Sequence, residues 1–173
     1  MAVRDILQLG NPLLYESTRE VEISELDYVK RVVVDLHDTM MSFRENYGIG
    51  RAIAAPQIGE MIRLVYMNTG APTVFINPVL DELSEERMEL WDDCMSFPDL
   101  LVRVERHQSC RITYRDLNWA LQRDYLSEGL SELLQHECDH LDGILAVSRA
   151  IDSRSFSFRQ EMSDNSERTV RQN

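Results

Sequence analysis

The sequence predicts an α+β domain in which antiparallel strands pack around a central helix that carries the segment HECDH. Apolar residues recur at helical spacing in two segments, one early and one late in the chain. The region between them alternates apolar and polar residues, as strands with one wet face do. Helix, strands and helix in that order, without internal repeats, are typical of an α+β fold.

The first helix is expected from Ser24 to Tyr47. Ser24 is placed to cap its start, and Gly48 is placed to end it. Its buried stripe is predicted to contain Val29, Val32, Val33, Leu36, Met40 and Phe43.

Strands are expected across the middle of the chain, after the small-residue loop GIGRAIAAPQIG. The apolar stretch IRLVYMN comes first, followed by TVFINPVL, where Pro78 indicates a sheet edge or an early end. From Met88 to Tyr125 the pattern alternates, as in LLVRVERH and CRITYRDL, which predicts antiparallel strands.

A second helix is expected from Ser127 to Asp142, with Gly143 ending it. Its buried side is predicted to contain Leu130, Leu133, Leu134, Cys138 and Leu141. The polar residues that follow divide the chain into one catalytic domain, residues 1–152, and a tail, residues 153–173, that is partly helical or disordered.

The composition limits the classes of function. The chain has 173 residues and a formal charge of -12, which argues against nucleic acid as a direct partner. No apolar run approaches the roughly 20 residues that span a bilayer, and the first residues do not resemble a signal peptide. We therefore expect a cytoplasmic protein that does not bind membranes.

The segment HECDH has the spacing of a metal site on a helix. Positions i and i+4 share a helix face, so His136 and His140 can bind one ion. Glu137 lies one step round the helix, where it can take a proton from a water held by that ion. The pattern predicts a metal-dependent hydrolase.

A catalytic site of this kind needs a third protein ligand and an open position. Ala146 stands six residues after His140, where one protease pattern requires a histidine, so that pattern is excluded. Glu161 in the polar tail and Cys94 in LWDDCMSFP remain as alternatives. A lone cysteine in an aromatic segment is more often a core residue, so the spacing alone does not choose between them.

Three segments, in order, resemble the three motifs of the peptide deformylases. They are GRAIAAPQIG, DDCMS and QHECDHLDG, and the resemblance covers most of the chain, including the opening ILQLGNPLL. It implies an enzyme of N-terminal protein processing that hydrolyses the formyl amide of N-formyl(methionyl) peptides and releases formate.

The resemblance also implies roles for individual residues. The metal would be Fe(II) in the cell, with Zn, Ni or Co able to occupy the same site. The metal ligands would be Cys94, His136 and His140, with Glu137 as general base and with Gln57 and the Met95 N–H holding the formyl oxygen.

The chain departs from the family pattern around the expected substrate pocket. Gly50 aligns with the first glycine of the first motif, but Ala52 takes the place of the second glycine. Asp93 takes the place of the glycine that precedes the cysteine of the second motif. Arg51 and Glu132 replace apolar residues that help to line the methionine pocket, and Leu133 follows Glu132 on the helix. We expect a pocket that is narrower or more polar, in which these two charges either pair or turn to solvent.

Two other functions remain open at this point. The chain could hydrolyse another small amide, or it could bind a metal or a peptide without turnover. The nascent chain N-terminus is the expected partner, whereas the acidic net charge is a poor match to a ribosomal surface.

Overall fold

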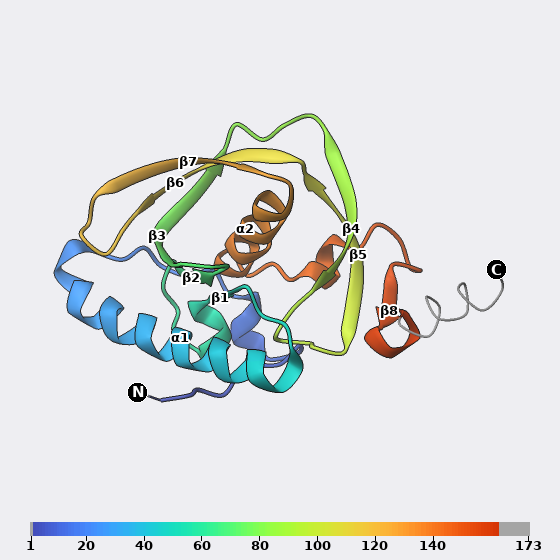
Figure 1. Ribbon diagram of the computed structural model, residues 1–173, viewed down its shortest axis with the longest axis horizontal. Coiled ribbons are helices and arrows are strands. Elements are labelled where there is room, and N and C mark those ends of the chain that lie inside the picture. The colour runs from blue at the N-terminus through green and yellow to red at the C-terminus, as the bar shows by residue number, and fades with distance from the viewer. Residues whose placement is uncertain (1, 163–173) are drawn as a thin grey trace.

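The structure is a computed structural model that describes residues 2–162, and in it two sheets surround a buried helix (Figure 1). The larger sheet has the strand order β1-β2-β3-β6-β7 and the smaller has the order β4-β5-β8, with antiparallel pairing throughout. The α+β fold predicted from the sequence is confirmed. The strands are β1 (Ala52–Ala54), β2 (Leu64–Asn68), β3 (Pro72–Asp81), β4 (Arg87–Asp93), β5 (Leu100–His107), β6 (Ser109–Arg115), β7 (Leu121–Ser127) and β8 (Phe156–Phe158).

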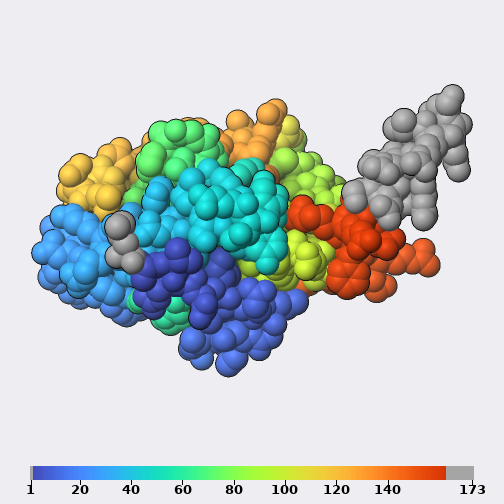
Figure 2. Space-filling view, turned by 60° about the horizontal axis from the view of Figure 1, so that its bottom comes forward, coloured from blue at the N-terminus to red at the C-terminus, as the bar shows by residue number. Residues whose placement is uncertain are grey.

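The helices whose full bounds fall within the described residues are two α-helices and several single turns of 3₁₀-helix. α1 covers the outside of the molecule below β1 and β2, and with the N-terminal segment it forms much of the face seen in Figure 2. Within the described residues, no helix is long and apolar enough to cross a membrane. The helices are η1 (Pro12–Tyr15), η2 (Ile23–Glu25), α1 (Leu26–Tyr47), η3 (Ala55–Ile58), α2 (Glu128–Leu141) and η4 (Ala146–Arg149).

α2 lies in the middle of the molecule, with β3, β6 and β7 arching over it and β4 and β5 beside it (Figure 1). Leu133, Leu134 and Leu141 pack against apolar residues from all five strands of the larger sheet. Every residue from Ser131 to Leu141 is buried, so the helix has no solvent-exposed face over that length. Buried polar side chains on such a helix require partners or a functional reason.

Two details of the helices differ from expectation. α1 begins at Leu26, because Ser24 lies inside the preceding turn η2 and the capping position is Glu25, without a side-chain cap. Leu130 was expected on the buried side of α2 but is exposed, since it lies in the first turn, before the helix enters the core. The expected helix end at Gly48 is confirmed by its left-handed conformation.

The prediction that Pro78 marks a sheet edge or a strand end was wrong. β3 lies between β2 and β6 and continues to Asp81. The register shifts between Ile76 and Val79, and Asn77 adopts a positive φ of 49°, so the strand passes the proline at an irregularity. A proline inside a sheet is tolerated where the ladder is already interrupted.

The expected tail begins at residue 153, but part of it joins the smaller sheet. β8 pairs with β5 through Leu100, Leu101 and Val102. Residues 163–173 lie outside the described part of the chain, so the division at residue 153 stays a prediction.

Candidate metal centre

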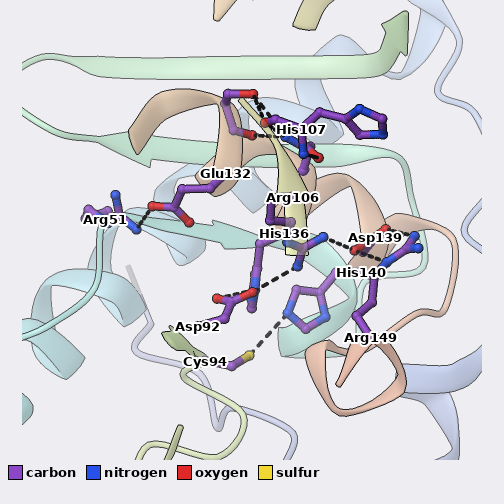
Figure 3. Close-up of polar contacts among 12 residues, drawn as sticks. Arg51, Asp92, Cys94, Arg106, His107, Glu132, His136, Asp139, His140 and Arg149 are labelled. Carbon is purple, nitrogen blue, oxygen red and sulfur yellow. Dashed lines mark hydrogen bonds and ion pairs between the residues drawn. The ribbon is translucent and has the colours of Figure 1, made fainter. Parts of the chain in front are cut away.

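Two histidines of α2 and one cysteine after β4 converge beneath the larger sheet (Figure 3). The potential ligand atoms of Cys94, His136 and His140 all lie within 4.8 Å of one another, and all three residues are buried. Cys94 Sγ is 3.2 Å from His140 Nε2. Glu161, the alternative third ligand, is not in this group.

The donor set fits a divalent transition metal. A thiolate and two imidazoles suit zinc or iron, and three protein ligands leave a position open for substrate or water. Asp92 bonds to Nδ1 of His136 at 2.9 to 3.0 Å, which leaves Nε2 as the nitrogen free to bind an ion. Nδ1 of His140 has no hydrogen-bond partner among the described residues.

The two imidazoles have opposite pKa shifts. Burial lowers the pKa of His136, but the charges of Asp92 and Cys94 outweigh burial and hold that pKa well above its ordinary value. Burial and the neighbouring His136 charge hold the pKa of His140 well below its ordinary value. His140 therefore favours the neutral form, which can donate a lone pair to a metal.

A network of charged side chains supports His136 through its partner Asp92. Arg106 of β5 donates to Asp92 at 2.9 Å and also pairs with Asp139 of α2, while Arg149 makes two bonds of 2.9 and 2.6 Å to Asp139. Burial raises the pKa of Asp92, but His136 and Arg106 more than offset this and lower it to about 2. Asp92 therefore stays ionised as an acceptor for His136.

Sequence reasoning missed Arg106, although a signal was present. In LLVRVERH, Arg106 continues the alternation of Val102 and Val104, whose side chains are fully buried. An arginine at an inward position of a strand requires buried acidic partners.

Glu137, next to His136 on α2, has a carboxylate oxygen without a partner. Its Oε2 is buried and has no hydrogen-bond partner among the described residues. Burial raises the pKa of Glu137 to about 7, although the neighbouring His136 charge opposes the shift. A carboxyl group with such a pKa can both take and return a proton near neutral pH.

Gln57 and Met95 lie beside the cysteine. Gln57 Oε1 accepts from the backbone N–H of Ala54 at 2.9 Å, which turns Nε2 toward Ser96 Oγ at 3.2 Å and Cys94 Sγ at 3.6 Å. The backbone N–H of Met95 has no acceptor among the described residues. Two hydrogen-bond donors therefore flank the group of potential ligands.

A cavity of about 630 Å³ opens over the site. Its lining includes Cys94, His136, Glu137, Gln57 and Met95. The residues expected from the sequence to contact substrate all line this cavity, and they are Gly50, Arg51, Ala52, Asp93, Glu132 and Leu133.

Arg44 was not expected in the cavity wall. From the last turn of α1 it donates to the carbonyl of Gly50 at 2.9 and 2.6 Å and to that of Asn68 at 2.8 Å. These bonds hold the loop before β1 against the end of β2. Gly50 has a φ of +124°, a conformation that favours glycine.

Arg51 and Glu132 face each other across one wall of the cavity (Figure 3). Arg51 Nη2 lies 2.5 Å from Glu132 Oε1, so of the two outcomes left open by the sequence the structure has the paired one. The Glu132 side chain is 11% exposed and that of Arg51 is 48% exposed.

Comparison with known proteins gives one consistent result. A family model described as polypeptide deformylase matches residues 3–156. A peptide deformylase of Prochlorococcus marinus is 36% identical, over 94% of this chain and 88% of that protein. One from Leptospira biflexa is also 36% identical, over 94% and 96% of the two chains.

Solved structures agree with the sequence matches. The crystal structure of a peptide deformylase from Thermotoga maritima has a TM-score of 0.81 at 26% identity, covering 88% of this chain and all (100%) of that chain. A peptide deformylase of Synechococcus elongatus in complex with actinonin has a TM-score of 0.79 at 28% identity, covering 88% and 87%.

Proposed function

The chain belongs to the peptide deformylase family, and on that premise we propose that Cys94, His136 and His140 hold its catalytic metal. As a member, it is a metal-dependent hydrolase that releases formate from N-formyl peptides. The observation that carries the residue assignment is the convergence of one cysteine sulfur and two imidazoles, all buried, next to a cavity that Cys94 and His136 line.

The metal in the cell is proposed to be Fe(II), and Zn, Ni or Co would suit the same donors. When bound, the ion would polarise the formyl carbonyl and lower the pKa of a water molecule. Asp92 keeps the ring of His136 oriented for this purpose, and Arg106 keeps Asp92 ionised.

Glu137 is proposed to move the proton. Hydrolysis adds a water oxygen to the formyl carbon, breaks the C–N bond and leaves formate and a free amine. Glu137 takes a proton from the water through its unpartnered Oε2 and returns it to the amine nitrogen as the C–N bond breaks. Its pKa of about 7 suits both transfers.

Gln57 and Met95 are proposed to stabilise the negative charge that develops on the formyl oxygen. The Gln57 amide is fixed by its bond from Ala54, so its Nε2 donor is already oriented before substrate arrives. The free N–H of Met95 is a second donor. Oriented donors of this kind typically contribute about 10² to 10³ in rate each.

Formate release by metal-loaded protein tests these roles. Glu137→Gln is expected to keep the metal and to lower the turnover rate by about 10² to 10⁴. Glu105→Gln is a matched control, because that carboxylate lies on the outside of β5 and is half exposed. Full activity in Glu137→Gln would show that Glu137 is not the general base. Loss of the metal in this variant would show that Glu137 is a metal ligand.

Amine release from a panel of amides and peptide binding, measured beside formate release, separate the remaining alternatives. Hydrolysis of other small amides without formate release would indicate the second enzyme function, and peptide binding without turnover would indicate a binding protein. Family membership favours the deformylase. The cytoplasmic location and the absence of nucleic-acid binding stay predictions, and ribosome association gains no support from the net charge of -12.

A further inference from the structure

The wall of the cavity that contains Arg51 and Glu132 is held rigidly. The carbonyl of Arg51 accepts from the Asn68 N–H at 2.9 Å, and the preceding carbonyl of Gly50 is held by Arg44. The Arg51 guanidinium also donates to the carbonyl of Gly129 at 3.3 Å, and a Cβ at Gly129 would already lie 3.9 Å from it. The ion pair is thus part of the cavity before any substrate binds.

Glu132 presents one acceptor to the cavity. In Figure 3 one carboxylate oxygen bonds to Arg51 and the other points away from Arg51. No described residue donates to that second oxygen. Glu132 stands one helical turn before His136, so the two residues lie on the same face of α2, and both line the cavity.

The chemistry of this wall discriminates among side chains that enter the cavity. An apolar side chain removes water from the ion pair and offers no hydrogen bond in return, which is unfavourable. A neutral donor, such as an amide or a hydroxyl, removes the same water but can bond to the free Glu132 oxygen.

Charged side chains fit less well. A cationic side chain that reaches Glu132 also approaches the guanidinium of Arg51, 2.5 Å from the same carboxylate. An anionic side chain that approaches Arg51 also meets the Glu132 carboxylate that is paired with it. Arg44 lines the cavity as well, but its guanidinium already donates to the carbonyls of Gly50 and Asn68. The wall therefore fits a neutral donor better than a charge of either sign.

We propose that Arg51 and Glu132 determine the side-chain preference of this deformylase, which takes N-formyl peptides whose first side chain is a neutral hydrogen-bond donor ahead of those with an apolar one. This inference rests on the proposed function.

Matched N-formyl-X-Ala-Ser peptides test the proposal, where X is glutamine, norleucine, lysine or glutamate. Glutamine and norleucine have similar length and differ in the terminal amide. In metal-loaded wild type, kcat/KM for glutamine is expected to exceed that for norleucine by about tenfold or more, since a buried acceptor discriminates against a substrate that lacks the donor. The apolar double variant Arg51→Leu/Glu132→Leu should shift the ratio toward norleucine by a similar factor.

A second ion pair provides the control. Arg87 and Glu105 lie 3.9 Å apart, half exposed, on the outside of the smaller sheet, so Arg87→Leu/Glu105→Leu makes the same chemical change away from the cavity. This variant should keep the wild-type ratio. Glu132→Gln preserves shape and is the second test if the leucine pair does not fold, with an expected ratio several-fold below that of wild type.

Binding of the unformylated peptides Gln-Ala-Ser and Nle-Ala-Ser, followed by calorimetry, gives a readout without turnover. The glutamine peptide is expected to bind more tightly to wild type. A wild-type preference for norleucine, lysine or glutamate, or a ratio that does not change in either Glu132 variant, would overturn the inference while leaving the deformylase activity intact. Absence of formate from every peptide would instead overturn the proposed function, and the inference with it.

Discussion

Replacing Arg106 by methionine is expected to destabilise the protein strongly, because the arginine compensates two buried carboxylates. The Arg106 side chain is 3% exposed, and those of its partners Asp92 and Asp139 are 5% and 12% exposed. After the change, Asp139 keeps Arg149 and Asp92 keeps only His136. One carboxylate is then left in the core without a permanent positive charge.

The magnitude follows from that burial. Removing one partner of a buried ion pair typically costs about 3 to 5 kcal/mol. For a chain of this size, each kcal/mol lowers Tm by about 2 to 4 °C, so the expected loss is about 6 to 20 °C. Arg87→Met is the control, because its partner Glu105 lies 3.9 Å away and both side chains are about half exposed. An exposed pair contributes about 0 to 1 kcal/mol.

Calorimetric Tm and urea unfolding of the metal-free proteins measure the difference. A loss in Arg106→Met no larger than that in Arg87→Met would refute the assignment of Arg106 as the compensating charge. Metal titration gives a second readout, because loss of an oriented carboxylate behind a histidine ligand typically weakens metal binding about 10- to 100-fold. Unchanged affinity would show that Asp92 orients His136 without help.

Three further outcomes are expected. The folded-state pKa of Asp92, about 2, lies below its unfolded value near 4, so the contribution of Asp92 to stability is full above pH 4 and is lost as the pH falls toward 2. The urea midpoint of the metal-free protein should therefore fall over this pH range, and it should fall less steeply in Asp92→Asn. Equal slopes in the two proteins would contradict the lowered pKa. Gly143→Ala should lower the free energy of unfolding in urea by about 2 to 5 kcal/mol, since a Cβ would lie 2.6 Å from backbone atoms in a residue with φ +71°. Gly59→Ala, with φ +82° and open space around the Cβ, should lower it by only about 1 to 2 kcal/mol. Similar losses in the two variants would refute the steric argument. Zinc at a hundred times its Kd should stabilise wild type by about 2.7 kcal/mol. In thermal scans Cys94→Ala should lose this gain and Cys110→Ala should keep it, and a gain retained in Cys94→Ala would exclude the cysteine as a ligand.

The features predicted correctly from the sequence are those that depend on local spacing. Helical periodicity placed His136 and His140 on one face, and the glycine after the first helix marked its end at Gly48. The order of the three motifs also favours Cys94 over Glu161 as third ligand, and that role stays a prediction, although the structure brings Cys94 to the two histidines. These predictions needed only the geometry of one element or the order of segments.

Features that depend on distant partners were not predicted. Arg106 acquires its role from Asp92 and Asp139, which lie on another strand and on α2. Arg51 and Glu132 are 81 positions apart, so the sequence could not decide whether they pair. Pro78 was misplaced because its effect depends on the bulge around Asn77 rather than on the proline itself.

The central position of α2 has a consequence for how the chain is made. The helix is the last long element in the described sequence, yet its leucines complete the apolar cluster formed by all five strands of the larger sheet. Until residue 141 has left the ribosome, the inner face of that sheet has nothing to cover it. Folding must therefore wait for contacts between segments far apart in the chain, which is slow and exposes apolar surface. An enzyme that acts on newly made proteins thus cannot assemble its own candidate metal centre until the two histidines of α2, positions 136 and 140, have been synthesised.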